Sequence, residues 1–292
     1  MRPAIQPQPR RLRRQLATLA ISLGLLVAAR PAGAADPLPP TPQPLLSAPP
    51  QRLGPPPDAS ADAATYQHCM QLAKSDPPAA RDLAKHWQDR GGAHPADHCF
   101  AVALIGLHEY KEAAGRLETL AQAMVRAPAA LRAEVLDQAG QAWLLAGDPA
   151  RAYAANGAAL ALLPHDPDIM IDRAAAAGSA GWYDKAVADL DRVLKAYPKR
   201  LDALIYRASA NRALNRLDQA DADIEQALKL SPDSAEALLE RGSIRRLRGD
   251  IAGARQDWMR VSQLAPGTAE DMAAKANMEH LDGDKPPQPA RP

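Results

Sequence analysis

Large apolar, small and turn-forming residues recur with a period of 34 over the second half of this chain. Pro164, Pro198, Pro232 and Pro266 are each 34 residues apart and fall at position 32 of four units, 133–166, 167–200, 201–234 and 235–268. Four further columns then align. They are large apolar residues at position 4 (Leu136, Met170, Leu204, Leu238), Gly or Ala at 8 (Gly140, Ala174, Ala208, Gly242), Gly or Asn at 15 (Gly147, Gly181, Asn215, Gly249) and Ala at 20 (Ala152, Ala186, Ala220, Ala254). A fixed period of this length predicts a repeat architecture.

Each column has a physical role in a pair of antiparallel helices, here called helix A and helix B. Small residues at positions 8 and 20 allow the two helices to approach closely. Gly or Asn at position 15 supplies the left-handed residue that ends helix A, and Pro at position 32 stops helix B. Asp148 and Pro149 predict the N-cap and the first turn of one helix B. We therefore expect one helical hairpin per unit.

This pattern resembles the tetratricopeptide repeat, a helix-turn-helix unit of 34 residues with small residues at positions 8 and 20 and proline at 32. The resemblance implies an all-α, right-handed superhelical solenoid of antiparallel helical hairpins. It is strong over 133–268 and weaker over 61–132. There, 62–74 and 77–90 are predicted to form a helical pair, and 94–128 forms a degenerate unit with Ala113 at position 20. Residues 269–281 are predicted to form a capping helix, which such stacks need, followed by a disordered tail over 282–292.

The first 34 residues have the pattern of a secretory signal peptide. An arginine-rich start is followed by an uncharged apolar run over 16–29 and by Ala32-Gly33-Ala34. This run is short for a membrane span, so cleavage after Ala34 is favoured over a retained anchor. Residues 35–60 are rich in proline and predict a disordered linker. We expect a periplasmic or secreted protein of bacterial type, with no stable membrane insertion after cleavage.

Loss of this segment changes the charge of the chain. The segment holds six arginines and no acid, so the remaining chain has 29 basic and 34 acidic side chains. Nucleic-acid affinity comes largely from basic residues that displace counterions, and the remaining chain has no surplus of basic residues. Nucleic acid is therefore not an expected partner.

Cys69 and Cys99 are the only cysteines. An even number of cysteines in an exported protein indicates a disulfide, which would secure the N-terminal units where the repeat is weakest. Free thiols and a redox or metal site are the alternatives, because His68 and His98 precede the two cysteines. Neighbouring helical residues point about 100° apart, so such a pair rarely converges on one ion.

Motifs that carry catalysis are missing from the sequence. It contains no nucleophile elbow, phosphate loop, dinucleotide fingerprint or zinc-protease motif. We therefore expect a protein that is not an enzyme and that uses no cofactor.

Positions 7 and 23 predict an ion pair between the two helices of a hairpin. Three units carry Arg at position 7 and Asp at position 23, whereas the first unit has Ala139 and Ala155. The three pairs are Arg173 and Asp189, Arg207 and Asp223, and Arg241 and Asp257. Because the two residue types occur together or not at all, we expect each Arg to be occupied by its Asp rather than by a ligand.

In the tetratricopeptide family, ligands usually lie in a concave groove lined by helix A positions such as 2, 5, 9 and 12. The resemblance therefore implies a partner groove formed by Glu134, Asp137, Gln141, Asp168, Ile171, Asp202, Ile205, Ser209, Arg212, Glu236, Leu239, Ser243 and Arg246. This groove would have an acidic rim at position 2 and an apolar middle at position 5. It would suit a peptide with apolar anchors and some basic character.

These observations favour a non-catalytic scaffold or adaptor that binds a protein or peptide partner in the periplasm. Two alternatives remain open. One is an accessory subunit of an envelope complex for polymer synthesis or secretion. The other is a redox or metal-handling protein that uses the His-Cys pairs.

Overall fold

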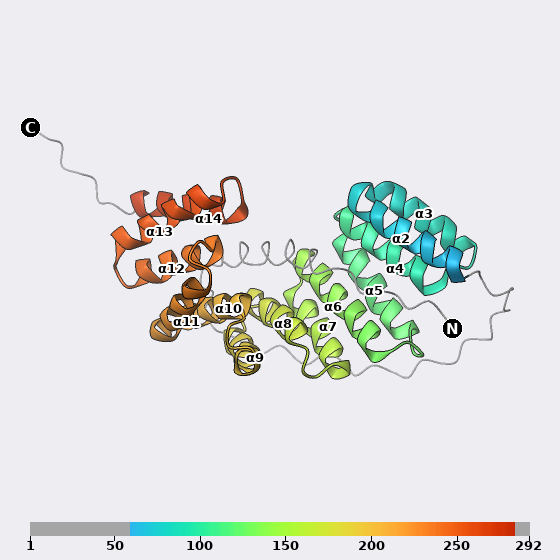
Figure 1. Ribbon diagram of the computed structural model, residues 1–292, viewed down its shortest axis with the longest axis horizontal. Helices are drawn as coiled ribbons and strands as arrows, with labels where there is room; N and C mark the ends of the chain where they lie inside the picture. Colours follow the sequence, from blue (N-terminus) through green and yellow to red (C-terminus); the bar gives the residue numbers. More distant parts are fainter. Residues whose placement is uncertain (1–58, 284–292) are drawn as a thin grey trace, which may run out of the picture.

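A computed structural model describes residues 59–283 as a curved stack of helices (Figure 1). This part of the chain contains 13 helices and no strand, so the all-α prediction is confirmed. The predicted signal peptide, nearly all of the linker and most of the C-terminal tail lie outside the described residues.

Twelve helices pair into six hairpins, and a thirteenth helix follows them. In chain order the hairpins are α2 (Ala59–Ser75) with α3 (Pro77–Asp89), α4 (Ala93–Gly106) with α5 (Tyr110–Ala123), α6 (Ala129–Leu145) with α7 (Pro149–Leu162), α8 (Pro167–Ser179) with α9 (Tyr183–Ala196), α10 (Leu201–Ala213) with α11 (Leu217–Leu230), and α12 (Ala235–Leu247) with α13 (Ile251–Leu264). The last helix is α14 (Ala269–Gly283).

The repeat columns mark the helix ends. The residues at position 15 have positive φ angles, 76° at Gly147 and Gly181, 58° at Asn215 and 83° at Gly249. Each helix B from α7 onward ends two residues before the proline of its unit. Asp148 also caps α7 as expected, since its side chain accepts the amide of Arg151 at 3.0 Å.

The stack has an inner and an outer layer. Helices α6, α8, α10, α12 and α14 contact one another in succession, and they lie on the inner side of the curve. Helices α9, α11 and α13 lie on the outer side (Figure 1). The inner layer therefore forms the concave face, which helix A of each unit lines.

Hairpins are packed tightly where a small residue faces a large one. A Cβ atom on Gly242 would lie 2.4 Å from Nε1 of Trp258, and one on Gly140 would lie 2.6 Å from the Asn156 amide. Gly at position 8 therefore makes room for a bulky residue at position 24 of helix B. In the hairpins of α8 with α9 and of α10 with α11, position 8 is Ala and position 24 is an aliphatic residue, Leu190 or Ile224.

The N-terminal hairpin has its own small core, and the predicted disulfide lies in it. The Sγ atoms of Cys69 and Cys99 are 2.03 Å apart, so the bond joins α2 to α4. Both cysteines are fully buried among Met70, Ala80 and Val102. The disulfide prediction is confirmed, and the bonded sulfurs leave no thiolate for a metal ion or a nucleophile in this state.

Residues 59–283 contain no helix with the length and hydropathy that a transmembrane span requires.

Candidate functional site

The concave face carries a row of polar and mainly acidic side chains. Its members come from positions 2 and 6 of successive inner helices, which lie four residues apart and so share one helix face. They are Glu134 and Gln138 on α6, Asp168 and Asp172 on α8, Asp202 and Tyr206 on α10, and Glu236 and Glu240 on α12. We call this set the inner polar row.

Arg200 connects two units of the inner polar row. Its Nη2 donates to Asp168 at 2.6 Å, and its Nε donates to Asp202 at 2.7 Å. The hydrogen bond to Asp202 is the main cause that raises the pKa of Arg200, and the bond to Asp168 adds to it. One guanidinium thus holds the carboxylates of neighbouring repeats in fixed positions.

Asp137 and Gln141 form a second connection at the start of the row. Asp137 accepts hydrogen bonds from Asn156 at 2.9 Å and from Gln141 at 3.2 Å, and Gln141 also donates to Asp172 at 2.7 Å. Asp137 is buried, although the sequence placed it in the groove. Its bond to Asn156 replaces the position 7 to 23 ion pair that this hairpin lacks.

Tyr206 lies between carboxylates from three repeats. Burial raises the pKa of its hydroxyl, and the nearby charges of Glu236, Asp172 and Asp202 raise it further. Tyr206 therefore stays neutral and remains a hydrogen-bond donor within an acidic surrounding.

Arg212 and Glu240 form an ion pair between α10 and α12. Nε of Arg212 donates to Oε1 of Glu240, and the attraction of this carboxylate is the main cause that raises the pKa of Arg212. Two arginines, Arg200 and Arg212, thus pair with three carboxylates of the inner polar row, Asp168, Asp202 and Glu240. With six carboxylates among its eight members, the row is acidic in composition.

A buried histidine extends the polar face to the N-terminal hairpins. The ring of His98 on α4 lies between the hydroxyl of Tyr66 on α2, at 2.8 Å, and Oε1 of Gln138 on α6, at 2.7 Å. Burial lowers the pKa of His98, and the bond to Gln138 opposes this shift only in part. His98 therefore acts as a neutral link between α2, α4 and α6.

The predicted apolar middle of the groove is wrong. Ile171, Ile205 and Leu239 at position 5 are at most 4% exposed and belong to the main hydrophobic core. Ser243 is also buried, and its hydroxyl donates to the carbonyl of Leu239. These side chains point into the packing between helices, so a partner on the concave face does not reach them.

The other predicted groove residues remain at least partly accessible. The four residues at position 2 and Gln141, Ser209 and Arg212 are partly exposed, and Arg246 is exposed. Position 6, where Asp172, Tyr206 and Glu240 lie, was not among the predicted groove positions. A signal was present, because position 6 is polar in all four strong units.

The ion pairs between positions 7 and 23 are confirmed. In each hairpin the Arg donates to the Asp through both Nε and Nη2. The Nε and Nη2 distances are 2.8 and 2.6 Å from Arg173 to Asp189. They are 2.9 and 2.6 Å from Arg207 to Asp223, and 2.9 and 2.7 Å from Arg241 to Asp257. The three aspartates are buried. These pairs close the hairpins and are occupied, as expected.

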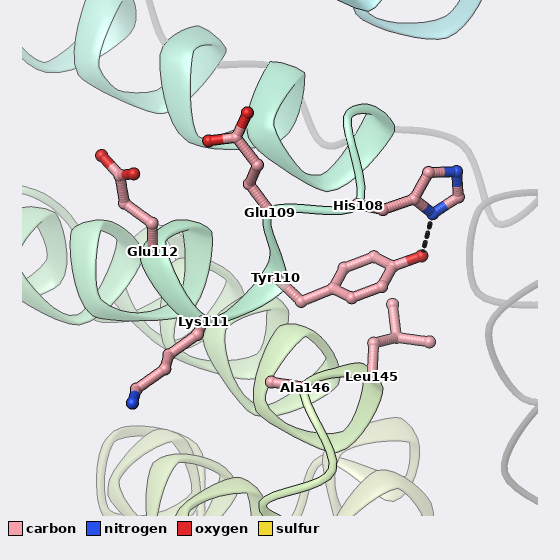
Figure 2. A pocket seen from close by; sticks show the side chains of 7 residues that line it. All are labelled: His108, Glu109, Tyr110, Lys111, Glu112, Leu145 and Ala146. Carbon is pink, nitrogen blue, oxygen red and sulfur yellow. Dashed lines mark hydrogen bonds between the residues drawn. The ribbon is translucent and has the colours of Figure 1, made fainter.

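A surface pocket lies apart from the inner polar row, where α4 turns into α5 and α6 ends. Figure 2 shows His108, whose Nδ1 is hydrogen-bonded to the hydroxyl of Tyr110, together with Glu109, Lys111 and Glu112. Leu145 and Ala146 complete its lining. His108 has a φ of 62° and stands at position 15 of the degenerate unit, so it performs the turn role that Gly has elsewhere. The turn between α4 and α5 therefore explains why His108 lies in this pocket.

The described residues contain no group of three or more His, Cys, Asp or Glu side chains arranged to hold a metal ion. Four carboxylates of the inner polar row, Asp168, Asp172, Asp202 and Glu240, are held by hydrogen bonds or ion pairs from Arg200, Gln141 and Arg212.

Comparison with known proteins agrees with this architecture. Residues 201–234 match the family model described as tetratricopeptide repeat. No curated protein matches the sequence significantly. Among solved structures, a thermophilic tetratricopeptide protein of Thermus thermophilus, TTC0263, is 18% identical with a TM-score of 0.51, and the match covers 64% of this chain and 98% of that one.

Two other solved structures are similar over a comparable length. MamA of Desulfovibrio magneticus RS-1 is 20% identical with a TM-score of 0.47, covering 67% of this chain and 94% of that one. YrrB, described as a tetratricopeptide protein with an unusual peptide-binding site, is 15% identical with a TM-score of 0.48, covering 67% and 96%. The repeat columns, the family match and the shared fold lead to one assignment: residues 201–234 form a tetratricopeptide repeat within an all-α stack of similar hairpins.

Proposed function

We propose that this protein is a non-catalytic scaffold that binds a basic segment of a partner protein on its concave face. The observation that carries the proposal is the inner polar row, in which carboxylates repeat from α6 to α12. Arg200, Gln141 and Arg212 hold four of these carboxylates, Asp168, Asp202, Asp172 and Glu240, so little ordering of these groups is needed when a partner binds. A row of negative charge favours a partner of opposite sign and speeds its association.

The correction at position 5 changes the expected partner. Because Ile171, Ile205 and Leu239 are buried, apolar anchors have no matching sites among these residues. Lys and Arg side chains of a partner would instead reach the partly exposed carboxylates at position 2 and that of Asp172 at position 6. Recognition would therefore depend strongly on ionic strength.

The signal-like first 34 residues support a periplasmic location, and the buried Cys69–Cys99 disulfide is consistent with an oxidising compartment. The protein would then present its concave face to other exported proteins or to envelope complexes.

Peptide binding tests the proposal. Fluorescence anisotropy should detect binding of Lys-rich and Arg-rich peptides to the protein at low salt, and no binding of Glu-rich peptides of the same length. Replacing Asp172 and Glu236 together by Asn and Gln should weaken binding at least tenfold, whereas the same change at the outer residues Glu225 and Asp233 should not. Equal binding of acidic and basic peptides, or equal loss in both double variants, would contradict the proposal.

A further inference from the structure

Helix α14 repeats the pattern of the inner helices. With Ala269 at position 1, Glu270 falls at position 2, Met272 at 4, Lys275 at 7 and Ala276 at 8. The corresponding residues of α12 are Glu236, Leu238, Arg241 and Gly242. The period of 34 thus continues for one more helix, and α14 has the sequence of helix A of a further repeat.

In a complete hairpin, helix B covers positions 4, 7 and 8. Leu238 is 4% exposed, Gly242 lies directly under Trp258 of α13, and Arg241 is paired with Asp257. Positions 4 and 8 are one helical turn apart and therefore lie on one face. This face of an inner helix is the contact surface for its helix B.

The same face of α14 is uncovered. Met272 is 63% exposed, Ala276 is exposed, and the side chain of Lys275 is 60% exposed. Met170, Leu204 and Leu238 at the equivalent of Met272 are at most 4% exposed. Within residues 59–283, no helix B follows α14.

We propose that this face of α14 binds an amphipathic α-helix of a partner protein, in the place that helix B takes in the complete hairpins. The site continues the intramolecular interface between α12 and α13, so its geometry is that of a hairpin. It is separate from the inner polar row, and the proposal stands independently of the one made for the concave face.

The complete hairpins define the chemistry of the partner helix. Where position 8 is Gly, position 24 is Asn156 or Trp258, and where position 8 is Ala, position 24 is Leu190 or Ile224. Since Ala276 stands at position 8 of α14, we expect Leu or Ile at the position of the partner helix that corresponds to position 24. Ala at position 20 and Asp at position 23 accompany these residues in α9 and α11. The expected pattern is Ala-x-x-Asp-Leu or Ala-x-x-Asp-Ile.

Charge complementarity supports the acidic residue in this pattern. Lys275 corresponds to Arg173, Arg207 and Arg241, each of which holds an Asp of helix B. In the free protein, Nζ of Lys275 donates to Asp271 at 2.8 Å. Since most of the side chain remains exposed, it can also receive a carboxylate from the partner helix.

A peptide with the sequence of α11, residues 217–230, is a direct probe. It contains Ala220, Asp223 and Ile224 in the required spacing, and a covalent link between its outward positions 222 and 226 would keep it helical. Titration of the labelled peptide with the mature protein should show saturable binding. Ala276→Arg should weaken this binding at least tenfold, and the peptide variant Ile224→Ser should bind equally weakly.

Two controls separate this site from others. Ser209→Arg on the concave face should leave peptide binding unchanged, and Ala276→Arg should leave the thermal midpoint unchanged because Ala276 is exposed. No saturable binding up to about 1 mM peptide, or binding that persists in Ala276→Arg, would overturn the proposal. It would also be overturned if sedimentation showed a dimer that Ala276→Arg dissociates, since a second copy would then occupy the face.

Discussion

Arg207 and Asp223 form a two-pronged ion pair that closes the hairpin of α10 and α11. Nε of Arg207 donates to Oδ2 at 2.9 Å, and Nη2 donates to Oδ1 at 2.6 Å. Arg207 also donates through Nη1 to Asp191 on α9 at 2.6 Å. One guanidinium therefore joins three helices, and its pKa is raised, chiefly by the hydrogen bond to Asp223.

We expect Arg207→Ala to lower the free energy of unfolding by about 3–5 kcal/mol, because it leaves the buried Asp223 carboxylate without its partner. The double variant Arg207→Ala, Asp223→Ala should cost less than the sum of the two single variants. Urea denaturation measures all three.

The control is the exposed pair of Arg216 and Asp184, where Arg216→Ala should cost about 0–1 kcal/mol. If the loss of unfolding free energy in the double variant equals the sum of the two single losses, Arg207 and Asp223 are not energetically coupled.

Gly242→Ala should destabilise the last hairpin by about 1–3 kcal/mol, because the added Cβ would lie 2.4 Å from Nε1 of Trp258. Gly115 in α5 is the matched control. An added Cβ there meets nothing within 4 Å, so Gly115→Ala should stabilise the protein by about 0.5–1 kcal/mol. Thermal unfolding followed by tryptophan fluorescence distinguishes the two. Equal effects would show that position 8 does not limit the approach of helices A and B.

Loss of the disulfide should loosen the N-terminal hairpins and leave the rest of the stack intact. Cys69 and Cys99 are 30 residues apart, so the double Ser variant should lose about 3–4 kcal/mol of local stability. Because repeat proteins are stabilised mainly between neighbouring units, amide hydrogen exchange should rise in α2 to α4 and stay unchanged in α10 to α13. Faster exchange in all helices would contradict a local role.

His98 should make stability depend on pH. Burial lowers its pKa in the folded protein below the ordinary value of 6.5, so the unfolded chain binds a proton more readily. Stability from this group is therefore present above pH 6.5 and decreases as the pH falls below 6.5, until the folded pKa is reached. Urea denaturation from neutral to mildly acidic pH should show this loss in the wild type, and His98→Gln should reduce it. The exposed His86, changed to Gln, is the control, and equal slopes for both variants would exclude His98 as the source.

Much of the fold follows from residues that act locally. Pro at position 32, Gly or Asn at position 15 and Ala at position 20 each restrict the backbone or the approach of two helices, so their period was enough to predict the hairpins. Asp148 and the ion pair of Arg173 and Asp189 were predictable for the same reason, since both partners lie within one hairpin.

The binding face depends on how successive hairpins are rotated, and this rotation is not local. Ile171, Ile205 and Leu239 are therefore buried although the family pattern placed position 5 in the groove. Asp137 was missed for another reason, because its bond to Asn156 uses positions 5 and 24 of one hairpin, which carry no such pair in the other units. His108 was missed as a turn residue because the degenerate unit hides its position 15.

Photocrosslinking in the native cells tests most directly whether a partner protein binds on the concave face. A photoreactive residue at Ser209 or Gln141 would face a partner on the concave face, and one at Ala222 on α11 would face outward. We expect one recurrent protein to be captured at both inner positions and not at Ala222, and we expect Asp172→Asn with Glu236→Gln to reduce the capture. Capture of that protein mainly at Ala222, or no capture at either inner position, would contradict binding on the concave face.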